Sequence, residues 1–241
     1  MYVLIFVLLG LTLFFSYKVK DYKFSIIPEG TPVKAETYII DAVSRPIVFD
    51  AQRKFLTALY REKHAGDCDH EKNGMDSCLL INPKIIVLHM TDLEDLEKSF
   101  EYMKEPVLRE ERDKLISRSY DRLNVSAHYL IDRDGTIYSL MPDNYMGRHA
   151  MGVNHLAIGV ENVGMNDRGP TREQIDSNVK LIRYLMKKYN IESKDIYSHT
   201  ETGHLRTKNS PYFVEKDENY FVQKNCGEKV IKDVRKRLKS I

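Results

Sequence analysis

The chain has 241 residues, with 42% hydrophobic and 30% charged side chains, a composition that is typical of folded globular proteins and argues against disorder. The formal net charge is +2 and no dense basic stripe is present, so a nucleic-acid partner is not expected. Three cysteines are too few for a disulfide scaffold. Cys68 and Cys78 could pair in an oxidising compartment, which would leave Cys226 as an odd thiol.

The first stretch, residues 1–17, is almost wholly apolar and has no polar face that would fit a core helix. Its length lies between that of a signal-peptide core and that of a membrane span. It lacks a positive n-region and a clear cleavage site, and the lysines that follow it favour a cytoplasmic C-terminal side, in conflict with export. We therefore expect a membrane-targeting segment, either a cleaved signal or a retained anchor, and leave its orientation open.

Residues 18–44 resemble a linker, because Pro28, Gly30 and Pro32 interrupt any regular element. The spacing of apolar residues then predicts a helix over Arg45–Glu62. A polar loop follows, so residues 45–80 are interpreted as an N-terminal helical extension and loop.

From residue 81 onward, predicted strands alternate with predicted helices in no strict βαβ order. This pattern favours an α/β domain, residues 81–241, with a central mixed sheet flanked by helices. Strands are expected over Ile85–Leu88 and Leu156–Val163, and a hairpin with an Asp-Gly turn over Ser126–Leu140. Helices are expected over Leu93–Arg118, with an interruption near Pro106, over Ile175–Tyr189, which a capping box at Thr171–Gln174 opens, and over Glu228–Lys239. An irregular segment is expected over Gly203–Val222.

Two histidines follow short apolar, strand-like runs: His89 after Lys84–Leu88, and His199 after Ile196–Ser198. A strand exit fixes the direction of a side chain, which suits a metal ligand or a catalytic base. Together with the Cys226 thiol they would supply the three protein ligands of a catalytic zinc with one open position. A satisfied structural histidine and an inert buried thiol remain the alternatives.

Two further charged residues fit the same chemistry. Glu161 lies within an apolar strand, where a carboxylate is costly unless it is paired or placed at a site, and it could serve as a general acid/base. Lys224 precedes Cys226 by two residues, so in an extended segment both side chains would point the same way, and it could stabilise an oxyanion. The alternatives are an outward-facing glutamate and a surface lysine.

Five short stretches stand out along the chain: Leu88-His89, Ser126–Gly135, Arg148-His149-Ala150, Ile158-Gly-Val-Glu161 and Ser198-His199. In this order they resemble the zinc N-acetylmuramoyl-L-alanine amidases, relatives of the peptidoglycan recognition proteins and of phage amidase lysozymes. The resemblance covers roughly residues 85–238. It implies a mixed sheet flanked by helices, a zinc ion, and cleavage of the bond between muramic acid and L-alanine.

The resemblance also implies roles for individual residues. His89 and His199 would bind zinc, Glu161 would be the acid/base, and His149 would lie near the substrate cleft. His128 and His204 are further candidates for substrate binding.

The third ligand departs from the family pattern, because the window after His199 offers only Thr207–Ser210 before Pro211. Cys226, in Lys224-Asn-Cys226-Gly227, is therefore assigned, with His204 or a degenerate site as alternatives. We expect a membrane-targeted zinc amidase of the cell envelope, periplasmic or extracytoplasmic, acting on peptidoglycan or muropeptides. A non-catalytic peptidoglycan-binding module and a zinc hydrolase of another amide remain the rivals.

Overall fold

A computed structural model describes residues 40–108, 122–218, 220 and 226–239. The predictions for residues 1–17, for most of the 18–44 linker, for the second half of the Leu93–Arg118 helix and for Lys224 therefore lie outside the described residues. All described residues belong to one compact unit.

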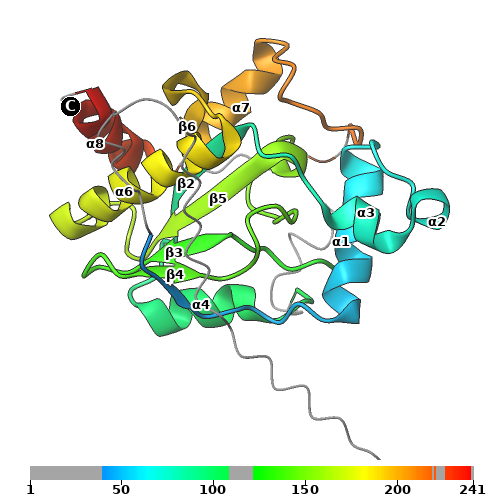
Figure 1. The fold of residues 1–241 in the computed structure, drawn as a ribbon, viewed down its shortest axis with the longest axis horizontal. Helices are drawn as coiled ribbons and strands as arrows, with labels where there is room; N and C mark the ends of the chain where they lie inside the picture. Colours follow the sequence, from blue (N-terminus) through cyan, green and yellow to red (C-terminus); the bar gives the residue numbers. More distant parts are fainter. Residues whose placement is uncertain (1–39, 109–121, 219, 221–225, 240–241) are drawn as a thin grey trace, which may run out of the picture. The chain divides into compact units, whose positions relative to one another are not determined.

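Six strands form a single mixed sheet in the order β1-β4-β3-β5-β2-β6 (Figure 1). Only the β3–β4 hairpin is antiparallel; the other neighbours are parallel. The strands are β1 (Ala42–Ser44), β2 (Ile85–Met90), β3 (Tyr129–Ile131), β4 (Ile137–Ser139), β5 (Ala157–Asn162) and β6 (Ile196–Ser198).

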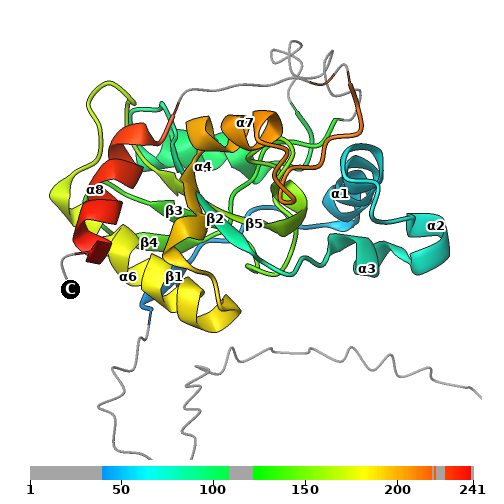
Figure 2. The same ribbon diagram turned by 90° about the horizontal axis from the view of Figure 1, so that it is seen from above.

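Helices flank this sheet, so the predicted fold class is confirmed. Figure 2 shows the sheet between layers of helix. The α-helices are α1 (Ala51–His64), α2 (His70–Asn73), α3 (Met75–Leu79), α4 (Leu96–Lys104), α6 (Arg172–Tyr189), α7 (His199–Thr207) and α8 (Glu228–Lys239).

Strand β2 lies in the middle of the core, and its two faces contact different helices. Ile86 and Leu88 belong to the cluster that includes the buried residues of α6 and α8. Ile85 and Val87 belong to a second cluster, with Leu205 of α7. Because side chains alternate along a strand, His89 projects to the same face as Ile85 and Val87.

Helix α6 begins as its sequence predicts. The Thr171 side chain accepts a hydrogen bond from the backbone N–H of Gln174, and the Gln174 side chain accepts one from the backbone N–H of Thr171. Such a capping box satisfies backbone donors that the first helical turn leaves unpaired. Gln174 also donates to the carbonyls of Ile131 and Val163 and so links α6 to the sheet.

The structure corrects three details. Residues 42–44 are strand β1 rather than linker, because they pair in parallel with β4. Helix α1 begins at Ala51, where Asp50 accepts a hydrogen bond from the Arg53 backbone N–H, and not at Arg45. The segment predicted to be irregular from Gly203 is helical as far as Thr207, because Ser198 and Glu201 form a capping box that opens α7.

The N-terminal extension is joined to the rest of the unit by packing and by a disulfide. Tyr60 of α1 packs with Ile81, Leu123 and Met146 in one buried cluster. Cys68 and Cys78 form a disulfide bond, with Cα atoms 5.6 Å apart, which closes the loop between α1 and α3.

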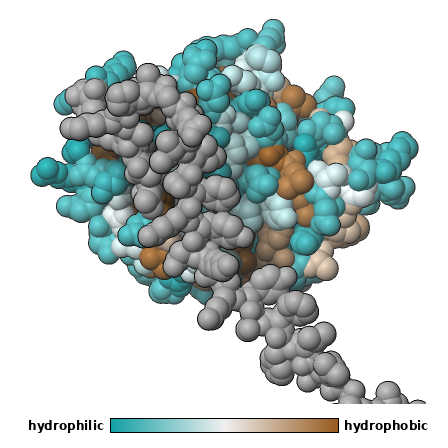
Figure 3. Space-filling view, viewed as in Figure 1, coloured by the Kyte–Doolittle hydropathy of each residue, from teal (hydrophilic) through white to brown (hydrophobic). Residues whose placement is uncertain are grey.

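On the face drawn in Figure 3, hydrophilic side chains predominate and hydrophobic ones form small, separate patches. Within the described residues, no helix combines the length and the apolar character needed to cross a bilayer.

Candidate metal centre and substrate cavity

His89 and Glu161 are brought together by the pairing of β2 with β5. The two residues are in register on neighbouring parallel strands, so their side chains project from the same face of the sheet. Nδ1 of His89 lies 3.9 Å from Oε1 of Glu161, and the exposed fractions of the two side chains are 2% and 18%. The Asn162 side chain donates a hydrogen bond to the His89 carbonyl at 3.1 Å and fixes the end of β2.

His199 is the first residue of α7, directly after β6. The Ser198–Glu201 capping box holds this turn, and Arg235 of α8 binds both carboxylate oxygens of Glu201 at 2.6 and 3.0 Å. The strand-to-helix junction therefore sets the direction of the His199 imidazole.

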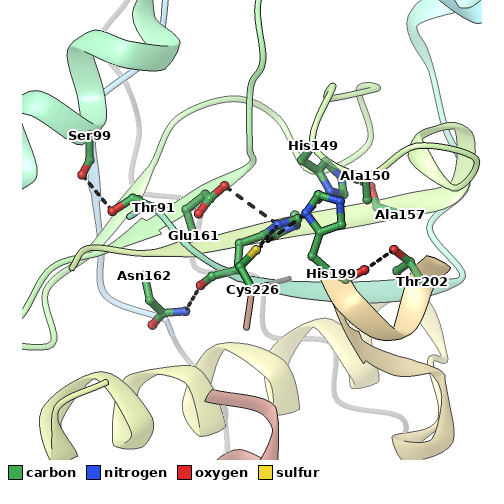
Figure 4. Close-up of polar contacts among 12 residues, drawn as sticks. Thr91, Ser99, His149, Ala150, Ala157, Glu161, Asn162, His199, Thr202 and Cys226 are labelled. Atoms are coloured by element: carbon green, nitrogen blue, oxygen red, sulfur yellow. Dashed lines mark hydrogen bonds and ion pairs between the residues drawn. The ribbon is translucent and has the colours of Figure 1, made fainter. Parts of the chain in front are cut away.

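Cys226 reaches the histidines because Gly227 follows it. Gly227 has φ +83°, and a Cβ at this position would collide with the carbonyl oxygen of Leu88. Only glycine accepts both conditions at little cost. The buried Sγ of Cys226 lies 3.9 Å from Nδ1 of His89 and 3.7 Å from Nδ1 of His199, and Figure 4 shows the thiol pointing toward the imidazole rings.

These three donor atoms fit zinc. They all lie within 4.8 Å of one another, and a tetrahedral zinc with bonds of about 2.3 Å to sulfur and 2.0–2.1 Å to nitrogen would separate sulfur from nitrogen by about 3.6 Å. Two imidazoles and one thiolate would leave the fourth position open, as in catalytic zinc sites.

His149 contacts the site from the loop that precedes β5. Its Nδ1 lies 3.2 Å from Nε2 of His89, and its Nε2 lies 3.3 Å from the carbonyl oxygen of Ala157. The ring packs over Gly159, where a Cβ would lie 2.6 Å from it. Burial disfavours the imidazolium form and lowers the pKa of His149 well below its ordinary value.

Of the other two predicted substrate-binding histidines, His128 packs behind His149, with ring centres 5.8 Å apart, and His204 lies elsewhere. His128 is fully buried; its Nδ1 accepts a hydrogen bond from the Gly159 N–H and its Nε2 donates to the Tyr145 carbonyl. His204 is exposed on α7 and lines a different surface depression. Neither residue is among those that line the cavity described next.

A cavity of about 140 Å³ opens over the three candidate ligands and Glu161. Its walls come from parts of the chain that are far apart in sequence. The residues that line it include His149, Thr91 after β2 and Ser99 of α4. Tyr60, Arg148 and Tyr220 also line it. Arg148 stands beside His149 in one quoted motif, whereas no sequence signal points to Tyr60.

The fold and the site define an α/β domain with a His₂Cys cluster at the ends of parallel strands, beside a carboxylate and a cavity. Residues 80–213, more than half of the chain, match the family model of the N-acetylmuramoyl-L-alanine amidases. The chain therefore belongs to this family, as its motifs predicted.

Endolysins of Escherichia phage T7 and Enterobacteria phage T3 are each 38% identical to the chain over 73 residues, which is 28% of this chain and 48% of either endolysin. The chain thus spans about half the length of the curated relatives it matches. Among solved structures, N-acetylmuramoyl-L-alanine amidase LysC from Clostridium intestinale URNW is 29% identical, with a TM-score of 0.38 over 54% of this chain and 87% of LysC.

Proposed function

We propose that the chain is a zinc-dependent hydrolase that cleaves the amide bond between N-acetylmuramic acid and L-alanine in peptidoglycan. The observation that carries this proposal is the convergence of His89, His199 and Cys226 within 4.8 Å, in a chain of the amidase family. The cavity beside these residues offers room for the reacting part of a muropeptide.

Zinc in such a site would polarise the scissile carbonyl and lower the pKa of a water molecule in its open position. Glu161 is then the proton carrier. Its Oε1 lies close to a ligand nitrogen, so the carboxylate can accept the proton of the attacking water and deliver it to the leaving nitrogen. Lys224, which lies outside the described residues, stays proposed as the group that stabilises the oxyanion.

His149 suits a positioning role toward His89 better than a direct role toward substrate. If Nδ1 of His89 binds the metal, Nε2 of His89 would be protonated and would donate a hydrogen bond to Nδ1 of His149. His149 in turn donates from Nε2 to the Ala157 carbonyl. Such a chain of hydrogen bonds fixes the tautomer and orientation of a ligand histidine, and the lowered pKa keeps His149 in the neutral form that the chain requires.

We further propose a location in the cell envelope, outside the cytoplasm, with residues 1–17 as the membrane-targeting segment. The Cys68–Cys78 disulfide supports this location, because disulfides are favoured in oxidising compartments. The location also agrees with the peptidoglycan substrate of the proposed reaction. Cell fractionation of the tagged full-length chain tests this, and recovery in the cytosolic fraction would contradict it.

The activity is tested with the full-length chain, purified in mild detergent and incubated with peptidoglycan. Mass spectrometry should find released peptides with a free N-terminal L-alanine. A chelator should abolish the release and added zinc should restore it. Glu161→Gln is the matched control, because it should keep the zinc and release little. Absence of released peptides together with far less than one zinc per chain would instead favour the non-catalytic binding module.

A further inference from the structure

One side of the cavity is formed by three long side chains from three separate segments. Tyr60 comes from α1, Arg148 from the loop before β5, and Tyr220 from the segment before Cys226, and all three line the cavity. Cζ of Arg148 lies 5.1 Å from the centre of the Tyr60 ring. Nη2 of Arg148 donates to the Tyr220 hydroxyl at 3.3 Å. We refer to these three residues as the Tyr60–Arg148–Tyr220 wall.

Tyr60 and the Arg148 loop are fixed to each other through Asn154. The Asn154 amide donates to the Tyr60 hydroxyl at 3.2 Å. Its oxygen accepts from the backbone N–H groups of His149 and Ala150 at 2.9 and 2.8 Å. Asn154 therefore fixes the position of Tyr60 relative to the loop that carries Arg148 and His149.

Tyr220 is fixed through α1. Its ring centre lies 4.6 Å from that of His64, and Nδ1 of His64 lies 2.8 Å from Oε1 of Glu215, with both side chains almost fully buried. Lys63 adds an ion pair to Asp217 at 3.2 Å. These contacts attach the segment that carries Tyr220 to the N-terminal extension, so the wall needs little reorganisation when a ligand binds.

Arg148 gives this wall its charge. Among the described residues that line the cavity, it is the one lysine or arginine, and its exposed fraction is 3%. A guanidinium stays protonated at all physiological pH values and carries five N–H donors in a planar fork that matches a carboxylate. In Arg148, Nη1 donates to the Leu123 carbonyl and Nη2 to the Tyr220 hydroxyl. In a site of low water content an anion gains more from such a group than it does in bulk water.

We propose that Arg148 is a specificity-determining residue that binds a free carboxylate on the peptide side of the scissile amide. This inference rests on the proposed function. In a muramoyl dipeptide the sugar and the scissile amide are uncharged, so the peptide supplies the only negative charge that could complement Arg148. The N-terminal extension and the segment before Cys226 then contribute substrate selection, while the strand ends contribute the chemistry.

Two substrates of equal size test this: N-acetylmuramoyl-L-alanyl-D-glutamic acid and the same compound with both glutamate carboxylates converted to carboxamides. The full-length zinc-loaded chain should favour the diacid in kcat/KM by at least about tenfold, which corresponds to one charge-assisted hydrogen bond. The difference should lie mainly in KM. Both substrates are measured on one protein preparation, so a partial loss of folded protein or of zinc lowers both kcat/KM values equally and leaves their ratio unchanged.

Variants then assign the preference. Arg148→Gln should bring the ratio of the two kcat/KM values close to one, whatever the absolute rate of the variant, and Arg148→Lys, which keeps the charge, should retain part of the preference. Arg122→Gln, at an exposed arginine that does not line this cavity, should keep the full ratio. Equal hydrolysis of both substrates by the unaltered chain, or an equal loss on both in Arg148→Gln, would overturn the inference and leave the proposed function standing. Failure to cleave either substrate would overturn both.

Discussion

At the residue scale, the three candidate ligands form a group, among the described residues, whose possible ligand atoms all lie within 4.8 Å of one another. His89→Ala and Cys226→Ser should each reduce bound zinc to well below one ion per chain, since two protein ligands hold zinc poorly. Metal analysis after dialysis measures this. His204→Ala, at an exposed histidine of α7, is the matched control and should keep the zinc of the parent chain. Full occupancy in His89→Ala would remove that residue from the ligand set.

Replacing Glu161 should leave the bound zinc in place, whereas replacing a ligand should not. Glu161→Gln keeps the size of the side chain but loses proton transfer, so we expect unchanged zinc content and a decrease in kcat of roughly 10²–10⁴, the usual contribution of a positioned acid/base. Zinc analysis and peptide release on the same preparation decide the question. A variant that keeps its zinc and nearly its full rate would return Glu161 to a structural role.

Residues carried by a contiguous motif could be predicted from the sequence, and residues that meet only through the fold could not. His89, Glu161 and His199 stand in or after strand-like runs, and the structure brings them together with Cys226 as expected. His128 belongs to the same kind of motif but uses both ring nitrogens on backbone groups, which no local pattern reveals. Tyr60 and Tyr220 are separated by most of the domain, and their meeting depends on how α1 packs.

At the element scale, the fit of prediction to structure follows the strength of the local signal. Helix α8 runs from Glu228 to Lys239 as predicted, and the Asp-Gly turn places the β3–β4 hairpin as predicted. Strand β1 was missed because three residues carry too little periodicity, and its pairing partner β4 is remote in sequence. Helix α7 differs from the prediction because its capping box, Ser198–Glu201, overlaps the strand-like run that leads to His199.

Helix α1 is joined to α4 by one buried arginine. The guanidinium of Arg53 donates to the carbonyls of Val48, Met103, Lys104 and Glu105 at 2.5–3.1 Å, and three of these belong to the end of α4, where helical carbonyls lack partners. Burial lowers the pKa of Arg53 to about 10. The side chain therefore remains charged at neutral pH and its hydrogen bonds are charge-assisted.

Arg53→Ala should lower the free energy of unfolding by about 2–4 kcal/mol, because it removes a buried side chain together with the charge-assisted hydrogen bonds that it donates to four backbone carbonyls. Urea unfolding followed by circular dichroism measures the loss. Arg172→Ala removes an arginine whose side chain is 80% exposed and whose nearest carboxylate, Asp176, lies 3.9 Å away, so a change within about 0.5 kcal/mol is expected. Equal effects of the two substitutions would contradict a special role for Arg53.

At the scale of the whole molecule, the segments added around the family motifs converge on the site instead of lying apart from it. The N-terminal extension supplies Tyr60 and His64, and the segment after α7 supplies Glu215 and Tyr220. The sequence predicts residues 45–80 to be an N-terminal extension, and the structure places one of them, Tyr60 of α1, in the lining of the cavity.

The stability of the whole domain should depend on pH through His128, the residue before β3. Its ring is hydrogen-bonded to the backbone of Gly159 in β5 and to the Tyr145 carbonyl. Burial lowers the pKa of His128 below its ordinary value of 6.5. Near pH 6.5, His128 therefore takes up a proton in the unfolded chain but stays neutral in the folded chain. The contribution of neutral His128 is fully present above that pH and is lost as pH falls toward the folded-state pKa.

The free energy of unfolding should accordingly decrease between pH 7.5 and pH 5.5 by up to about 1.4 kcal/mol per pH unit for this one group. Urea unfolding in the presence of a chelator measures the decrease without a contribution from metal release. The glutamine in His128→Gln cannot titrate, so the free energy of unfolding of this variant should depend less steeply on pH than that of the parent chain, even though the variant is less stable at every pH.

If that variant does not fold, the ring shifts of His128 in nuclear magnetic resonance of the parent chain give the same answer, because the neutral form protonated at Nε2 should persist at pH 5.5. Parallel pH dependences of parent and variant, or a charged His128 ring at pH 5.5, would contradict the prediction, since either result would mean that the folded chain accepts the proton as readily as the unfolded one.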